Sequence, residues 1–312
     1  MISFKTYSIV RIVLVLLVTI PALAIFSLLF RKPGYRHDNT RRWVDYTKIA
    51  SGIWGLSRIS AQTLQILQQI IFVAYYDDTR GWFEAYPARD ASFALGFIGS
   101  MLEVWAAIAI FLALFYLAHA LTQLRTEGQE DSSAYRKGRK VALGVSGFLF
   151  ALNLVTLCLA LASNFPASWD DHTRAMYLVA SCFTIASAGI VIICAIGSVV
   201  YSAKSRKKAL GSPVQKVRLV LTGGGSLTTN RVFSQAATIL VVCSSLYLVR
   251  AAWYIVIFFY GIYEIFAIID VFVGCWIPFV ILVLLYFLAT KEVYSLSKTH
   301  YRSSTVADSQ AA

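Results

Sequence analysis

Long apolar stretches alternate with short polar ones along the whole chain. Seven of these stretches reach the roughly 20 mostly apolar residues that a membrane-spanning helix needs. They are residues 9–30, 47–76, 91–121, 141–163, 175–202, 232–259 and 265–290. The pattern predicts an all-α polytopic membrane protein, in which residues 1–302 form one bundle of seven transmembrane helices. Residues 303–312 are small and polar, and we expect a disordered cytoplasmic tail there.

The stretch 47–76 is the least apolar, and could instead form an amphipathic helix on the membrane surface. The distribution of basic residues decides between the two. If all seven stretches cross, one side carries the loops 31–46, 122–140 and 203–231 and the tail from Lys291. With Lys48, these hold 21 of the 28 Lys and Arg residues, whereas the other side holds four. Such an excess marks the cytoplasmic side. We therefore expect seven spans, with the N-terminus outside and the C-terminus in the cytoplasm.

The first stretch also has features of a secretory signal peptide. Lys5 precedes an apolar run, and Ala22-Leu23-Ala24 is similar to a cleavage site. The run continues to Phe30, however, and cleavage would reverse every later loop against the charge distribution. We expect an uncleaved first helix.

The composition supports a membrane protein and therefore affects how the net positive charge is interpreted. Hydrophobic residues make up 58% of the 312 residues and charged residues 14%, and the mean hydropathy is +0.66. Soluble domains carry about a quarter charged residues. A net charge of +12 would favour nucleic acid as the partner of a soluble protein. Here the cations gather in the predicted inner loops, so we expect no nucleic-acid partner. We expect integration in the plasma membrane or an endomembrane.

The sequence offers no catalytic or cofactor-binding set. Ser146 lies in a Gly-Val-Ser-Gly segment similar to that of rhomboid-type serine proteases, but no histidine in a later helix could act as its base. The five cysteines have no metal-binding spacing. The final two helices lack the central lysine that retinal requires. We expect no enzyme activity, no metal and no cofactor.

Charged residues at membrane depth are costly unless paired or hydrated, so each is a candidate functional residue. Arg58, Gln62, Gln65 and Gln69 recur at helical spacing and form one polar stripe. This stripe should face the bundle interior. Glu103 lies at a depth similar to that of Arg58, which predicts an ion pair between them.

A second charged pair is expected near the outer side. Arg250 and Asp270 both fall in the outer half of consecutive helices, which a short turn makes neighbours. Arg250 should therefore pair with Asp270, or as a second choice with Glu264. The pair either locks the bundle or belongs to a ligand site. In a ligand site, the aromatic walls would be Tyr247, Trp253, Tyr254 and Tyr263.

The inner loops are candidates for contacts with lipid and protein. A basic cluster follows the fifth span and consists of Lys204, Arg206, Lys207 and Lys208. Such clusters attract anionic lipid. Loops 122–140 and 203–231 would be the docking site of a cytoplasmic signalling partner.

Seven helices, an outer N-terminus and basic inner loops resemble the plan of G-protein-coupled receptors. Cys275-Trp276-Ile277-Pro278 is similar to the CWxP motif of rhodopsin-like receptors. That motif lies in their sixth helix, whereas here it lies in the seventh. The third helix lacks the acidic-Arg-Tyr signature, and the seventh lacks Asn-Pro-x-x-Tyr. In topology, size and charged sixth helix, the chain also resembles fungal orphan seven-helix proteins, including the lipid-translocating exporter-like group.

These observations predict a receptor-like or sensor protein that binds a small or lipidic ligand in its polar core. A transporter or lipid translocator could use the same core as a pathway. A non-signalling scaffold would use the charges only to hold helices together. A receptor predicts a cavity open on one side, a transporter predicts access from both sides, and a scaffold predicts a dry, fully paired core.

Overall fold

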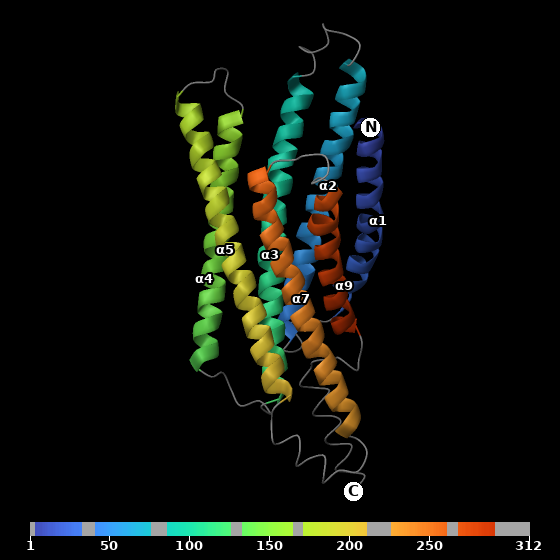
Figure 1. The fold of residues 1–312 in the computed structure, drawn as a ribbon, viewed down its shortest axis with the longest axis vertical. Coiled ribbons are helices and arrows are strands. Elements are labelled where there is room, and N and C mark those ends of the chain that lie inside the picture. Colours follow the sequence, from blue (N-terminus) through green and yellow to red (C-terminus); the bar gives the residue numbers. More distant parts are fainter. Residues whose placement is uncertain are drawn as a thin grey trace.

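The computed structural model describes residues 4–32, 41–75, 86–125, 133–164, 171–210, 226–260 and 268–290. These residues form long helices and contain no β-strand. The helices are α1 (Phe4–Phe30), α2 (Arg42–Tyr75), α3 (Tyr86–Arg125), α4 (Ser133–Asn164), α5 (Asp171–Leu210), α7 (Ser226–Tyr260), η2 (Val271–Trp276) and α9 (Ile277–Thr290). All of them run along the long axis of the molecule (Figure 1). Each of the seven apolar stretches lies largely within one of these helices or, for the last stretch, within η2 and α9.

Six helical segments in the described part of the chain are long and apolar enough to cross a membrane. They are Ile9–Phe30, Phe93–Thr122, Tyr135–Asn164, Asp171–Lys207, Ser234–Ile257 and Ile268–Thr290. Large hydrophobic side chains also cover the outside of the bundle, among them Ile20, Val141, Ile193 and Phe259. Exposing so much apolar surface to water is unfavourable, whereas the hydrocarbon core of a bilayer solvates it. The chain is therefore a membrane-embedded helical protein.

Helix α2 is not one of these six segments, but it is part of the bundle. It has 34 residues and runs beside α3 in the opposite direction (Figure 1). The Ser57 hydroxyl donates a hydrogen bond to the Gly99 carbonyl oxygen on α3, at 3.1 Å. Trp43 and Trp54 are almost fully buried. Helix α2 is thus packed against the protein along the part whose side chains are described.

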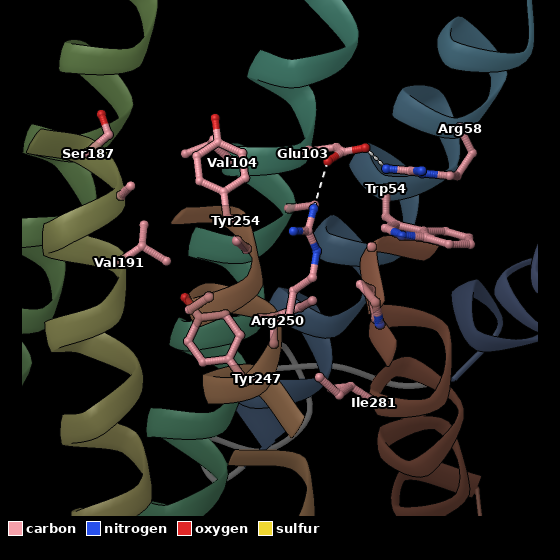
Figure 2. A pocket seen from close by; sticks show the side chains of 17 residues that line it. Trp54, Arg58, Glu103, Val104, Ser187, Val191, Tyr247, Arg250, Tyr254 and Ile281 are labelled. Atoms are coloured by element: carbon pink, nitrogen blue, oxygen red, sulfur yellow. Dashed lines mark hydrogen bonds and ion pairs between the residues drawn. The ribbon is translucent and has the colours of Figure 1, made fainter. Parts of the chain in front are cut away.

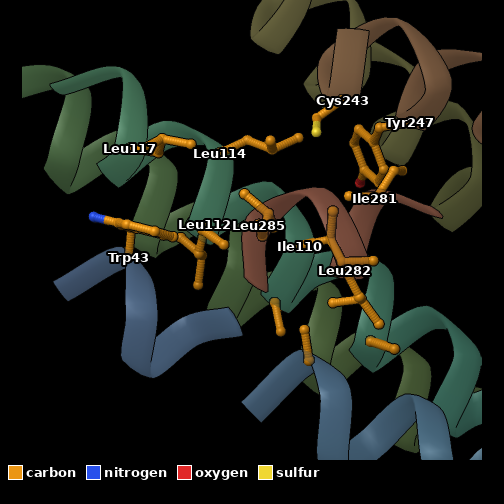
Figure 3. Packing of buried hydrophobic residues seen from close by; sticks show 14 of the residues in the cluster. Trp43, Ile110, Leu112, Leu114, Leu117, Cys243, Tyr247, Ile281, Leu282 and Leu285 are labelled. Carbon is orange, nitrogen blue, oxygen red and sulfur yellow. The ribbon is translucent and has the colours of Figure 1, made fainter. Parts of the chain in front are cut away.

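Helix α3 occupies the centre of the fold. In its most apolar window 72% of the residues are buried, compared with 17% in α4. Small buried residues on α3, such as Ala109 and Ala113, allow neighbouring helices to approach closely. Leucines and isoleucines of α3 and α9 interdigitate with Tyr247 of α7 (Figure 3). Residues on α3 therefore face several helices at once.

Basic residues gather at one end of the bundle. This end contains the beginnings of α2 and α4 and the end of α5 (Figure 1). Arg136, Lys137 and Lys140 are exposed at the start of α4. Two contacts fasten neighbouring helices at the same end. Arg41 donates from Nη2 to the Ala289 carbonyl oxygen at 3.1 Å, and Lys48 donates from Nζ to the Lys32 carbonyl oxygen at 2.6 Å.

The last span contains an irregular turn. Residues Val271–Trp276 form a π-helix, η2, which is followed by α9 with Pro278 at its second position. Such turns often occur where a helix carries a functional group. A Cβ atom placed on Gly274 would lie 2.8 Å from Oδ1 of Asp270. Gly274 thus leaves room for the Asp270 carboxylate to lie against the helix.

Candidate functional site

Three charged side chains from three helices meet inside the bundle. Glu103 of α3 lies between Arg58 of α2 and Arg250 of α7 (Figure 2). Arg58 contacts Oε1 of Glu103. Arg250 donates from Nη2 to Oε2 of Glu103 at 2.8 Å. We call these residues the charged triad. The ion pair between Arg58 and Glu103, predicted from their matching depths, is confirmed.

The predicted pair between Arg250 and Asp270 is wrong. In the described residues, the guanidinium of Arg250 binds Glu103, and Asp270 instead accepts a hydrogen bond from Trp253 Nε1 at 3.2 Å. The short connection does place α7 beside the last span, but it does not fix which face of α7 points there. Arg250 faces the central helix α3, where Glu103 can accept from two arginines on opposite sides.

A cavity adjoins the charged triad. Its volume available to water is about 50 Å³. A single water needs roughly 10–15 Å³ on this measure, so the cavity could hold several waters or a small chemical group. Helices α2, α3, α5, α7 and α9 and the π-turn η2 all contribute to its wall. All three triad residues line it.

Most of the cavity wall is apolar. The residues involved are Val104, Ala106, Ala107 and Ile110 of α3, Ala188 and Val191 of α5, Ala251 of α7, and Pro278 and Ile281 of α9. Ser187 also lines the wall, but its hydroxyl donates to the Phe183 carbonyl oxygen at 2.8 Å within α5. The cavity is therefore charged at the triad and mostly apolar elsewhere. This combination is typical of sites that bind organic molecules.

The structure assigns the predicted aromatic residues to different places. Tyr247 and Tyr254 line the cavity, and the ring centroid of Tyr254 lies 5.9 Å from Cζ of Arg250 (Figure 2). Trp253 does not line it and binds Asp270 instead. Tyr263 and Glu264 lie outside the described residues.

Trp54 is a cavity residue that the sequence motifs did not predict. This side chain lines the cavity, is 2% exposed, and lies under Arg58, whose Cζ is 5.9 Å from the ring. Trp54 precedes Arg58 by four residues, so extending the polar stripe of α2 by one turn would have found it. Its Nε1 has no hydrogen-bond partner among the described residues.

The glutamine stripe is described only in part. Gln62 is buried, and neither of its amide atoms has a partner within the described part of the chain. Gln62 lies one turn from Arg58 but does not line the cavity. The side chains of Gln65 and Gln69 lie outside the described residues. Arg58 and Gln62, the described part of the polar stripe, are thus buried in the bundle, as the spacing predicted.

The basic cluster after the fifth span lies at the end of α5. Lys204, Arg206 and Lys207 are exposed there, whereas the side chain of Lys208 lies outside the described residues. Within loops 122–140 and 203–231, residues 126–132 and 211–225 also lie outside the described residues. The contacts with anionic lipid and with a signalling partner remain predictions.

Comparisons with known proteins assign no family. No protein-family model matches the sequence, and no curated protein or solved structure shows significant similarity to it. The functional argument therefore rests on the charged triad and the cavity beside it.

Proposed function

We propose that the chain is a seven-helix membrane receptor or sensor that binds a small or lipid-like ligand in the cavity beside the charged triad. In this proposal α2 crosses the membrane with the six more apolar segments. The N-terminus faces the outside, and the basic end of the bundle faces the cytoplasm. The 21 basic residues expected on one side, together with the burial of Trp43 and Trp54 on α2, support this topology.

The observation that carries the proposal is the position of the charges. A pair that served only to lock helices would be best sealed by close packing, because a fully paired core needs no empty space. Instead, Arg58, Glu103 and Arg250 all line a cavity. The triad also joins α2, α3 and α7, so a ligand that engages either arginine would alter contacts among three helices. Such contacts can shift a bundle between two arrangements.

Hydrogen bonds that join α5 to α7 and to α3 offer a route for the signal. Ser202 of α5 and Ser244 of α7 share a hydrogen bond of 2.8 Å between their hydroxyl oxygens. Closer to the basic end, Thr122 of α3 and Ser205 of α5 lie 3.4 Å apart. Movement of α7 against α3 would therefore reach α5, whose end leads into the loop 203–231.

Thiol labelling at the cavity tests the proposal. Ala251 lines the cavity next to Arg250, so Ala251→Cys introduces a thiol there without removing a charge. The five native cysteines would first be replaced. Ala113→Cys, on the buried face of α3 and not part of the cavity wall, serves as the matched control. Intact membranes would be treated with an impermeant thiol reagent from either side, and with permeant N-ethylmaleimide.

We expect Ala251→Cys to react from the outside only, and Ala113→Cys to stay unmodified. Reaction from both sides would contradict a receptor and favour a transporter that uses the same core. If even N-ethylmaleimide failed to modify Ala251→Cys, the cavity would be closed. The charged triad would then be a structural lock, and the proposed function would be wrong.

A further inference from the structure

The cavity carries more positive charge and more hydrogen-bond donors than its own residues can satisfy. Two arginines face one glutamate, so the charged triad has a net charge of +1. Each guanidinium has five N–H groups, whereas the carboxylate of Glu103 has only two oxygens. In the described part of the chain, Nε of Arg58 has no hydrogen-bond partner.

Trp54 adds a further unsatisfied donor at the same place. Its Nε1 is buried and has no acceptor in the described residues, and its side chain lines the cavity. An indole N–H can donate but cannot accept. Leaving such a donor unpaired in a buried site is costly. The cavity therefore lacks an acceptor. Asp270 lies against Gly274 but does not line the cavity, and it accepts from Trp253, so the charges that line the wall sum to +1 and indicate that the acceptor is an anion.

The surroundings of the charges limit the shape of the anion. Apart from the triad, the wall consists mainly of alkyl and aromatic side chains. The cavity volume of about 50 Å³ suits a small headgroup and a few methylene groups. A single negative charge would balance the triad. These features together fit a carboxylate at the end of an acyl chain better than a large or multiply charged group.

We propose that the cavity binds the carboxylate of a fatty acid or a similar single-chain anionic lipid. Arg58, Arg250 and the Trp54 N–H donate to the carboxylate, and the first part of the acyl chain contacts Val104, Val191 and Ile281. This proposal rests on the proposed function, because it names the class of ligand for the same cavity.

Charge should control affinity in this site. An acyl chain that moves from the bilayer into an apolar cavity gains little, because lipid is as apolar as the cavity wall. Selection must therefore come from the headgroup. Losing a charge-assisted hydrogen bond costs about 10-fold to 100-fold in affinity. Changes of charge within the triad should thus shift binding in a direction set by their sign.

The test uses the full chain in nanodiscs of zwitterionic lipid and radiolabelled oleate as the probe. Methyl oleate, which has no charge, and oleoyl lysophosphatidate, which carries a phosphate, serve as competitors. We expect oleate to bind and methyl oleate not to compete. Equal competition by methyl oleate would overturn the preference for an anion. Tighter binding of lysophosphatidate than of oleate would overturn the assignment of a carboxylate.

Two variants of opposite sign separate a ligand site from a structural lock. Arg250→Gln should weaken oleate binding about 10-fold or more, because the triad becomes neutral. Glu103→Gln should strengthen binding, because the net charge rises to +2. Loss of binding in both variants, when both are folded by circular dichroism, would overturn the proposal, since a structural role predicts the same direction for each. Arg11→Gln is the matched control, because Arg11 is an arginine of α1 outside the cavity wall.

Trp54→Phe keeps the test decisive where a charge variant fails to fold. Phenylalanine retains an aromatic ring but lacks the N–H group. Because this N–H has no partner in the described residues, the substitution breaks no hydrogen bond of the folded protein. We expect about 5-fold to 10-fold weaker oleate binding. Unchanged binding would overturn the proposal. Because Ala251→Cys labelling does not depend on oleate, an open cavity without oleate binding would refute the ligand class alone.

Discussion

At the scale of residues, the central feature is a glutamate shared by two arginines. The depth of each charge along its helix could be predicted from the sequence, and this was sufficient for Arg58 and Glu103. It was not sufficient for Arg250, because depth alone does not state which face of α7 meets which helix. The choice of Glu103 over Asp270 depends on packing against α3, which no spacing within α7 encodes.

A double-mutant cycle distinguishes the two partners of Arg250. We expect Glu103→Gln and Arg250→Gln to show a coupling of about 1–3 kcal/mol in the free energy of unfolding, because they remove the same interaction. The cycle of Asp270→Asn with Arg250→Gln should show a smaller coupling. Unfolding in detergent micelles, followed by circular dichroism, would measure both. A larger coupling with Asp270 would contradict the observed pairing.

Removal of Glu103 alone should be the most damaging single change in the triad. Glu103→Gln leaves two buried arginines without a counter-charge, and breaking a buried pair costs about 3–5 kcal/mol. Arg250→Gln should cost less, because Arg58 still neutralises Glu103. Thermal unfolding of the purified variants in one detergent gives the order. If Arg250→Gln destabilised the protein more than Glu103→Gln, Arg58 would not pair with the Glu103 carboxylate.

At the scale of elements, each predicted apolar stretch lies largely within described helical residues, but the sequence did not predict the irregular turn. Apolar length indicates where a chain can cross a membrane, and this information is local. The π-helix at Val271–Trp276 could not be predicted from local sequence, even though Pro278 follows it closely. Within this turn, Gly274 leaves room for the Asp270 carboxylate, which accepts a hydrogen bond from Trp253.

Gly274→Ala tests that arrangement. The new methyl group would approach Oδ1 of Asp270 to 2.8 Å, so the carboxylate or the backbone must move. We expect a loss of about 1–3 kcal/mol in the free energy of unfolding. Gly197→Ala on α5 is the control, because no other described residue lies within 4 Å of its added Cβ. The control should be neutral or slightly stabilising. Equal effects of the two substitutions would contradict the close contact.

The hydrogen bond between Ser202 and Ser244 offers a measure of the contact between α5 and α7. Both hydroxyls are buried, and their oxygens are 2.8 Å apart. Hydrogen bonds between membrane helices contribute about 0.6 kcal/mol on average. We expect a coupling of that order between Ser202→Ala and Ser244→Ala in unfolding experiments. Strict additivity would show that the two hydroxyls do not interact in the membrane.

At the scale of the whole molecule, the number of spans depends on α2. Its apolar character is weak because Arg58 and Gln62 are buried in the bundle rather than exposed to lipid. Hydropathy along the chain cannot distinguish an inward-facing polar stripe from a surface helix. The positions of the basic residues predict that α2 crosses the membrane, and the structure shows that α2 packs beside α3.

Sidedness of the loops tests the topology directly. With seven spans, cysteines introduced in 33–40 and in 76–85 should lie on opposite sides of the membrane. We expect an impermeant thiol reagent added outside intact cells to label only the second. Labelling of both positions from one side would place α2 on the membrane surface.

The central claim is that the charged triad holds a ligand in the adjoining cavity. Native mass spectrometry of the protein extracted from its own membrane, in a mild detergent, tests it most directly. We predict a non-covalent adduct on the unmodified protein and on Arg11→Gln, and its loss from Arg250→Gln. No adduct on the unmodified protein, or an equal adduct on all three proteins, would contradict the claim.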